Sequence, residues 1–131
     1  MNEIKVAASC FEVVAKISGI FLNLGRRLRK DPFFVDIKNG VNFYRQENRG
    51  LFEQYLEGTT IGDGTVLCYW LDISIWDDRI ELEASILRNK FSEQETVKIL
   101  AEASHADLSE LDKSLKILEP LMLDVDIKQY A

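Results

Sequence analysis

Residues 67–86, LCYWLDISIWDDRIELEASI, decide the fold of this chain. The first half of the stretch places five apolar side chains on one face of an extended strand: Leu67, Tyr69, Leu71, Ile73 and Ile75. After a short turn at Asp77-Asp78, the alternation resumes with Ile80, Leu82, Ala84 and Ile86. The stretch therefore predicts an antiparallel hairpin with one buried face and one solvated, acidic face.

Upstream of this hairpin, further segments indicate strands. Residues 33–37 and 41–44 look extended, and Asn39-Gly40 between them is the dipeptide most typical of a short hairpin turn. Residues 51–57 fit either a strand or a short helix, and we favour a strand. Gly62-Asp63-Gly64 marks a turn by composition.

The two ends of the chain have a helical period instead. In residues 2–30, apolar side chains recur every three or four positions, including Val14, Phe21, Leu24 and Leu28. Four basic residues at positions 26, 27, 29 and 30 suit the negative end of the helix dipole, and Asp31-Pro32 then ends the helix.

Residues 92–120 predict two more helices. Ser92-Glu93-Gln94-Glu95 matches a capping box, which predicts a helix to about Ser104. Asp107 is a suitable N-cap for a second helix with leucines at helical spacing, which Pro120 ends or kinks. Residues 121–130 fit a last turn or an edge strand, and the sequence does not decide between them.

This order of elements predicts the α+β class. We expect an N-terminal helix, an antiparallel sheet of three to five strands, and two C-terminal helices packed on the sheet. The length of 131 residues and the absence of a linker predict a single domain over residues 1–131.

Composition indicates a cytoplasmic protein. Cys10 and Cys68 lie 58 positions apart in apolar runs, so we expect two reduced, buried thiols rather than a disulfide framework. The sequence shows no secretory signal pattern, and its early uncharged stretch, residues 17–25, is too short to cross a membrane.

No motif predicts a catalytic, cofactor or metal site. The single histidine, His105, is expected to be a solvated side chain or a helix-end partner. Gly62-Asp63-Gly64 lacks the lysine, hydroxyl and following helix of a phosphate-binding loop. Two distant cysteines and one histidine do not make a zinc site, and carboxylates such as Glu81 and Glu83 are more simply explained as a solvated strand face than as Mg²⁺ ligands.

Charge is divided unevenly along the chain. Residues 1–50 carry nine basic and five acidic residues, net +4, whereas residues 51–131 carry seven basic and 17 acidic residues, net −10. The acidic part would repel phosphates, which argues against nucleic acid as the main ligand. It would instead attract a basic protein partner.

The leading functional hypothesis is therefore a non-enzymatic binding protein that acts through an acidic surface. Its most concrete form is a small bacterial inhibitor or immunity protein that neutralises a basic toxin or nuclease. The side chains expected to contact the partner are Trp70, Asp72, Trp76, Asp77, Asp78, Glu81 and Glu83. Whether Trp70 and Trp76 lie in a core or on the surface is left open by the sequence.

Two alternatives remain at this stage. One is an acidic chaperone or adaptor for an exported protein, which requires an exposed apolar groove and self-association. The other is a small-molecule-binding or carboxylate-based enzyme domain, which requires Glu47, Glu53 or Glu57 to converge with Asp72 in a cleft.

Overall fold

The computed structural model describes the backbone of residues 3–131 and the side chains of residues 12–131 other than Leu108. Helix α1 (Glu3–Lys30) comes first. Five strands then follow in a row: β1 (Phe34–Gln46), β2 (Arg49–Thr60), β3 (Val66–Ile75), β4 (Ile80–Lys90) and β5 (Glu93–His105). Helix α2 (Leu108–Asp124) and the short 3-10 helix η1 (Ile127–Tyr130) end the chain. The α+β class predicted from the sequence is confirmed.

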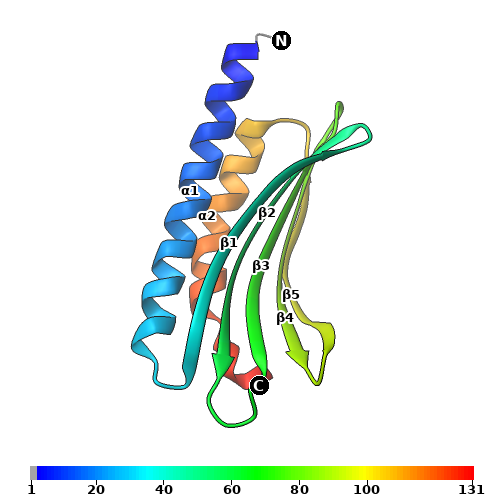
Figure 1. Cartoon of the computed structure of the whole chain (residues 1–131). Helices are drawn as coiled ribbons and strands as arrows, with labels where there is room; N and C mark the ends of the chain where they lie inside the picture. The colour runs from blue at the N-terminus through cyan, green and yellow to red at the C-terminus, as the bar shows by residue number, and fades with distance from the viewer. Residues whose placement is uncertain (1–2) are drawn as a thin grey trace.

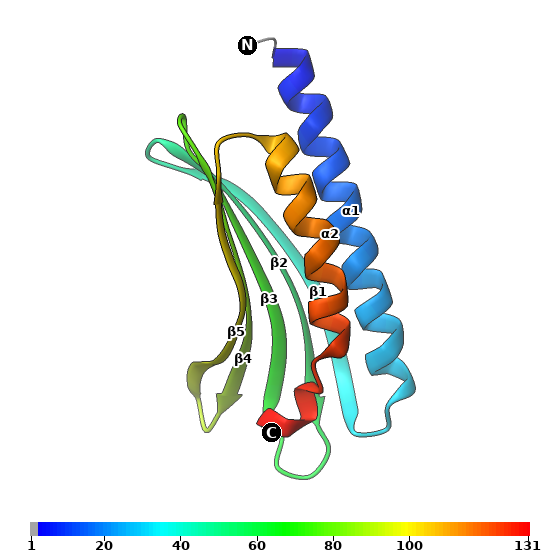
Figure 2. The ribbon, with the colours of Figure 1, turned by 180° about the vertical axis from the view of Figure 1, so that it is seen from behind.

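The strands form one antiparallel sheet in the order β1-β2-β3-β4-β5, so each strand pairs with its neighbour in the sequence. Both helices lie side by side on one face of this sheet (Figure 1). Within residues 3–131 the opposite face carries no helix, and the strands bow so that this face is concave (Figure 2). We call it the open face.

The core lies between the helices and the sheet. Its sheet side consists of the apolar side chains that the alternation in residues 67–86 predicted to be buried. Leu67, Leu71 and Ile86 are completely buried. Helix α1 contributes Ile17, Phe21 and Leu24, and α2 contributes Leu111, Leu115, Leu118 and Met122. Burying each large apolar side chain stabilises the fold by roughly 1.5–3 kcal/mol, so this layer holds the helices on the sheet.

The hairpin predicted from residues 67–86 is confirmed as β3 and β4, with Leu71 opposite Ala84. The Trp76 amide donates to the Arg79 carbonyl oxygen at 2.8 Å and closes the turn. The ambiguous residues 51–57 lie in β2, as favoured. The turn at residues 62–64 is also present, and Asp63 closes it by accepting hydrogen bonds from Thr60 and Thr65.

The helix predicted for residues 92–104 is wrong, because these residues form β5. Phe91 and Ser92 have φ values of 55° and 63°, which is the left-handed pair that a two-residue type I′ hairpin turn requires. Ser92 is therefore a turn residue and not an N-cap. The ladder with β4 shifts register between Ala84 and Ser85, and again between Ile86 and Leu87. These two irregularities remove the strict alternation that would have predicted a strand.

The hairpin turn predicted at Asn39-Gly40 is also wrong, because both residues lie inside β1 and the turn follows Gln46. Gly40 has a different function there. The Tyr55 ring on β2 covers it so closely that a Cβ atom at Gly40 would lie 2.2 Å from Tyr55 Cζ. A glycine is needed because the neighbouring strand's aromatic ring occupies the space of a side chain.

The helices at the two ends of the chain agree in most respects with those predicted from the sequence. Helix α1 ends at Lys30, before Asp31-Pro32, and Asp107 caps α2 by accepting a hydrogen bond from the Glu110 amide. Helix α2 passes through Pro120 to Asp124, so the proline does not end it. The undecided tail forms η1.

Two expectations about composition can be compared with the described part of the chain. Cys68 is a free, buried thiol, whereas the side chain of Cys10 lies outside the described residues. Over residues 3–131, neither helix has an apolar stretch long enough to cross a membrane.

Candidate functional site

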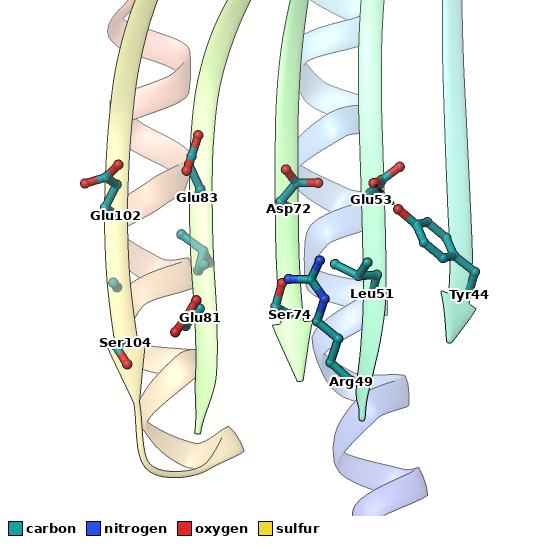
Figure 3. A pocket seen from close by; sticks show the side chains of 12 residues that line it. Tyr44, Arg49, Leu51, Glu53, Asp72, Ser74, Glu81, Glu83, Glu102 and Ser104 are labelled. Atoms are coloured by element: carbon teal, nitrogen blue, oxygen red, sulfur yellow. Dashed lines mark hydrogen bonds between the residues drawn. The ribbon is translucent and has the colours of Figure 1, made fainter. Parts of the chain in front are cut away.

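Strand register places four carboxylates in one line across the open face. Glu53 on β2 pairs with Asp72 on β3, Asp72 pairs with Glu83 on β4, and Glu83 pairs with Glu102 on β5. Figure 3 shows the four side chains on four adjacent strands at one level of the sheet. We call these residues the acidic row. It includes two residues predicted from sequence, Asp72 and Glu83.

Like charges directly opposite each other destabilise a sheet, by roughly 0.2–1 kcal/mol per pair. The acidic row contains three such pairs. Among the described side chains, none of its four carboxylates forms an ion pair with a lysine or arginine. The fold therefore carries a concentrated negative charge whose carboxylates have no ion-pair partner in the described part of the chain.

Asp72 is the least solvated member of the acidic row. Burial raises the pKa of this carboxyl and nearby Glu53 adds to the effect, while the Trp70 side chain and Arg49 oppose it. One of its oxygens, Oδ1, is buried without a hydrogen-bond partner among the described residues. A buried carboxylate oxygen without a donor is costly, and a donor from outside would remove that cost.

The acidic row crosses a shallow, open depression of about 630 Å³. Tyr44 on β1 lies at one end of it, where its hydroxyl donates to Glu53 Oε1 at 2.8 Å. This hydrogen bond to the carboxylate raises the pKa of Tyr44. Arg49 also lines the depression, and Ser74, Glu81 and Ser104 form the next level of side chains along the strands (Figure 3).

An apolar level lies on the other side of the acidic row, two residues along β2, β3 and β4, and three residues along β5 because of its bulge. Tyr55 and Trp70 stack there with ring centroids 5.8 Å apart and an interplanar angle of 14°. Because Tyr55 extends over Gly40, this pair covers β1 to β3. The same register continues through Ser85 to Ile99 on β5, which is 49% exposed. We call Tyr55, Trp70 and Ile99 the apolar row.

Trp76 has a different environment, at the turn between β3 and β4. Two guanidinium groups lie over its ring, that of Arg79 at 4.6 Å and that of Arg49 at 5.1 Å from the centroid. Arg79 also forms ion pairs with Asp78 at 2.9 Å and with Glu81 at 2.7 Å. Much of the negative charge at this turn is thus neutralised by the chain itself.

The seven predicted contact residues therefore separate into two groups. Trp70, Asp72 and Glu83 belong to the open face, where the two carboxylates form no ion pair with a described side chain. Trp76, Asp78 and Glu81 gather around Arg79, and Asp77 is exposed in the same turn. Trp70 and Trp76 are both half-buried and lie outside the main core. The sequence prediction omitted Glu53, Glu102 and Tyr55 as contact residues.

His105 contacts side chains near the start of α2. It is therefore a helix-end partner, which is one of the two roles expected for it from the sequence. Its Nε2 lies 2.8 Å from the Ser114 hydroxyl oxygen, and its Nδ1 lies 3.9 Å from a carboxylate oxygen of Glu110. A serine next to a histidine that is next to a carboxylate, here Ser114, His105 and Glu110, is also the arrangement of a catalytic nucleophile, its general base and the group that orients the base. However, Ser114 lies inside α2 rather than on a strained turn, and these residues join the end of β5 to the helix.

The carboxylates of the open face are arranged in a line rather than around a point. Over the residues that the structure describes, no three histidine, cysteine, aspartate or glutamate side chains form a group that could hold a metal ion. Glu53 does lie opposite Asp72, while Glu57 lies four residues further along β2, opposite Cys68. Of the three upstream carboxylates, only Glu53 lines the depression with Asp72.

Comparisons with protein-family models, with curated proteins and with solved structures found no match to this chain.

Proposed function

We propose that this chain is a non-enzymatic binding protein whose open sheet face receives a basic protein partner. The most concrete form of the proposal is a small bacterial inhibitor of the immunity-protein type, which neutralises a basic toxin or nuclease in the cytoplasm. The observation that carries it is the acidic row, four carboxylates at one register position that form no ion pair among the described residues.

The acidic row favours binding in two ways. A basic partner would relieve the repulsion between neighbouring carboxylates and supply the donor that Asp72 Oδ1 lacks. A concentrated negative surface also speeds encounter with a positive one, by about 10- to 1000-fold at low salt. The stacked rings of Tyr55 and Trp70 add rigid apolar area next to the charges, as the energetic centres of protein interfaces do.

The shape of the site favours a protein over a small molecule. The depression extends over five strands and is open to solvent along the sheet, whereas ligand pockets usually enclose most of their ligand. The side-by-side placement of Glu53 and Asp72 is the one feature that the small-molecule alternative shares with this proposal. The chaperone alternative requires a different binding surface on this chain, an exposed apolar groove instead of an acidic face.

The test is a pull-down with the tagged protein at about 50 mM and about 300 mM salt, concentrations at which exposed charges are weakly and strongly screened. The decisive variant is Glu83→Lys/Glu102→Lys, in the acidic row. Its matched control is Glu12→Lys/Asp124→Lys, which makes the same charge change at exposed positions of the helix layer.

We expect a stoichiometric basic partner that the control retains and that the acidic-row variant or high salt releases. A partner that both variants retain equally would refute the open face as its binding site. Stable self-association together with capture of unfolded or apolar segments would favour the chaperone instead.

A further inference from the structure

The spacing of the acidic row carries information about the partner, on the assumption that the proposed function is right. The row runs across the strands and not along them, since each carboxylate belongs to a different strand. Neighbouring strands in a sheet are about 4.7–4.9 Å apart. The backbone positions of the row therefore repeat at about that interval, from β2 to β5.

An α-helix repeats at nearly the same interval, because its pitch is about 5.4 Å. A helix that lies across the strands presents one side chain per turn to each carboxylate. Over the three steps from Glu53 to Glu102 the two repeats differ by about 2 Å, which the long side chains of lysine and arginine accommodate. An extended segment fits less well, since its side chains on one face repeat every 6.6–6.8 Å or so.

The apolar row gives such a helix a second contact. On β2 and β3 it lies two residues from the acidic row, a distance of about 7 Å, and on β5 the bulge makes the offset three residues. A helix with its side chains is about 10 Å wide. Tyr55 and Trp70 are half-buried and Ile99 is 49% exposed, so apolar surface is accessible beside the charges. One helix can thus cover both rows at once.

We propose that the open face binds a basic amphipathic α-helix of the partner, lying across β2 to β5. Lysine or arginine side chains at positions i, i+4, i+7 and i+11 of this helix face the four carboxylates of the acidic row. Apolar side chains at i+1, i+5 and i+12, each about 100° further round the helix than the neighbouring basic residue, pack on Tyr55 of β2, Trp70 of β3 and Ile99 of β5. Recognition is by charge complementarity and by helical period, both of which are set by the strand register.

The experiment uses three synthetic peptides of about four turns, each labelled with a fluorophore and capped at both ends. The first carries lysine and leucine at the helical positions given above, with alanine elsewhere. The second has the same composition with lysine and leucine alternating, as in a strand. The third is the first with a central proline, which breaks the helix. Affinity for the full chain is measured by fluorescence anisotropy at about 50 mM salt.

We expect the helical peptide to bind about tenfold tighter than either of the others and to gain helicity when bound, seen by circular dichroism. Glu83→Lys/Glu102→Lys should weaken this binding by about tenfold or more, and Glu12→Lys/Asp124→Lys should not. Equal binding of the alternating peptide, or helical binding that the acidic-row variant does not affect, would overturn the inference.

The two proposals can fail separately. If the pull-down partner is lost in the acidic-row variant while the peptides bind alike, the open face is the interface but its ligand is not a helix. If the peptides discriminate but no partner depends on the acidic row, the face has the helical specificity and the proposed function fails.

Discussion

Replacing Asp72 by asparagine should stabilise the protein at neutral pH. Asp72 has like-charged neighbours on both sides, Glu53 on β2 and Glu83 on β4, and the substitution removes both repulsions. At roughly 0.2–1 kcal/mol for each pair, the gain is about 1 kcal/mol. Asparagine has nearly the same shape, so packing beside Trp70 is retained.

The pH dependence makes this prediction specific. The folded state raises the pKa of Asp72, so its ionised form costs stability at neutral pH. That cost disappears as the pH falls through the raised pKa toward the ordinary value of an aspartate. The difference between Asp72→Asn and the wild-type protein should therefore be largest near pH 7 and shrink toward about pH 4.

Urea unfolding at several pH values measures the free energy of unfolding directly, and a gain of about 1 kcal/mol raises the melting temperature by about 4 °C. Glu12→Gln, at an exposed position on α1, serves as the control and should change stability by less than about 0.5 kcal/mol. A less stable Asp72→Asn protein at pH 7, or a gain that stays constant down to pH 4, would refute the role assigned to charge repulsion.

Three further predictions concern the fold that positions the open face. Gly40→Ala should destabilise the protein by about 1–3 kcal/mol in urea unfolding, because the new Cβ displaces the Tyr55 ring; an unchanged midpoint would contradict the close approach. Ser92→Gly should stabilise it by about 1 kcal/mol, because glycine adopts the left-handed turn conformation without strain, whereas a loss of stability would favour a helix N-cap at this position. Leu118→Ala should cost about 2–5 kcal/mol in the same assay, since Leu118 is 1% exposed in the core under α2, and a loss below about 1 kcal/mol would contradict that packing.

The parts of the fold that were predictable are those in which local pattern and tertiary environment agree. Residues 67–86 carry an apolar side chain at every second position of each strand, because both strands lie inside the sheet and one face of each is covered by helices. Helix α1 was equally predictable, since its apolar face repeats over many turns. In these segments, short-range periodicity reports directly which side of the element is buried.

The errors arose where distant residues decide the local structure. The conformation of β5 depends on pairing with β4 through two bulges, while Glu93-Gln94-Glu95 and Leu100-Ala101-Glu102 have good helix propensity. Gly40 is explained only by Tyr55, 15 residues away in the sequence. Neither the pairing of β5 with β4 nor the contact between Gly40 and Tyr55 can be predicted from hydrophobic periodicity or from turn composition.

The candidate site was half predictable for the same reason. Asp72 and Glu83 lie on the hairpin whose register the sequence suggested, so their place on a solvated face could be inferred. Glu53 and Glu102 join them only through the pairings of β2 with β3 and of β4 with β5. Because Glu102 was assigned to a helix, the complete acidic row could not be seen from the sequence.

The bulges of β5 also bear on how the chain avoids aggregation. A sheet of this order has two outer strands, β1 and β5, whose outward backbone groups lack a partner strand and could seed fibres of stacked copies. Both strands are irregular: β5 shifts register twice, and β1 shifts between Val35 and Lys38, where Asp36 has a left-handed φ of 50°. Such interrupted edges make poor templates for a second sheet, so we expect the chain to present its concave open face at high concentration without polymerising along the two outer strands.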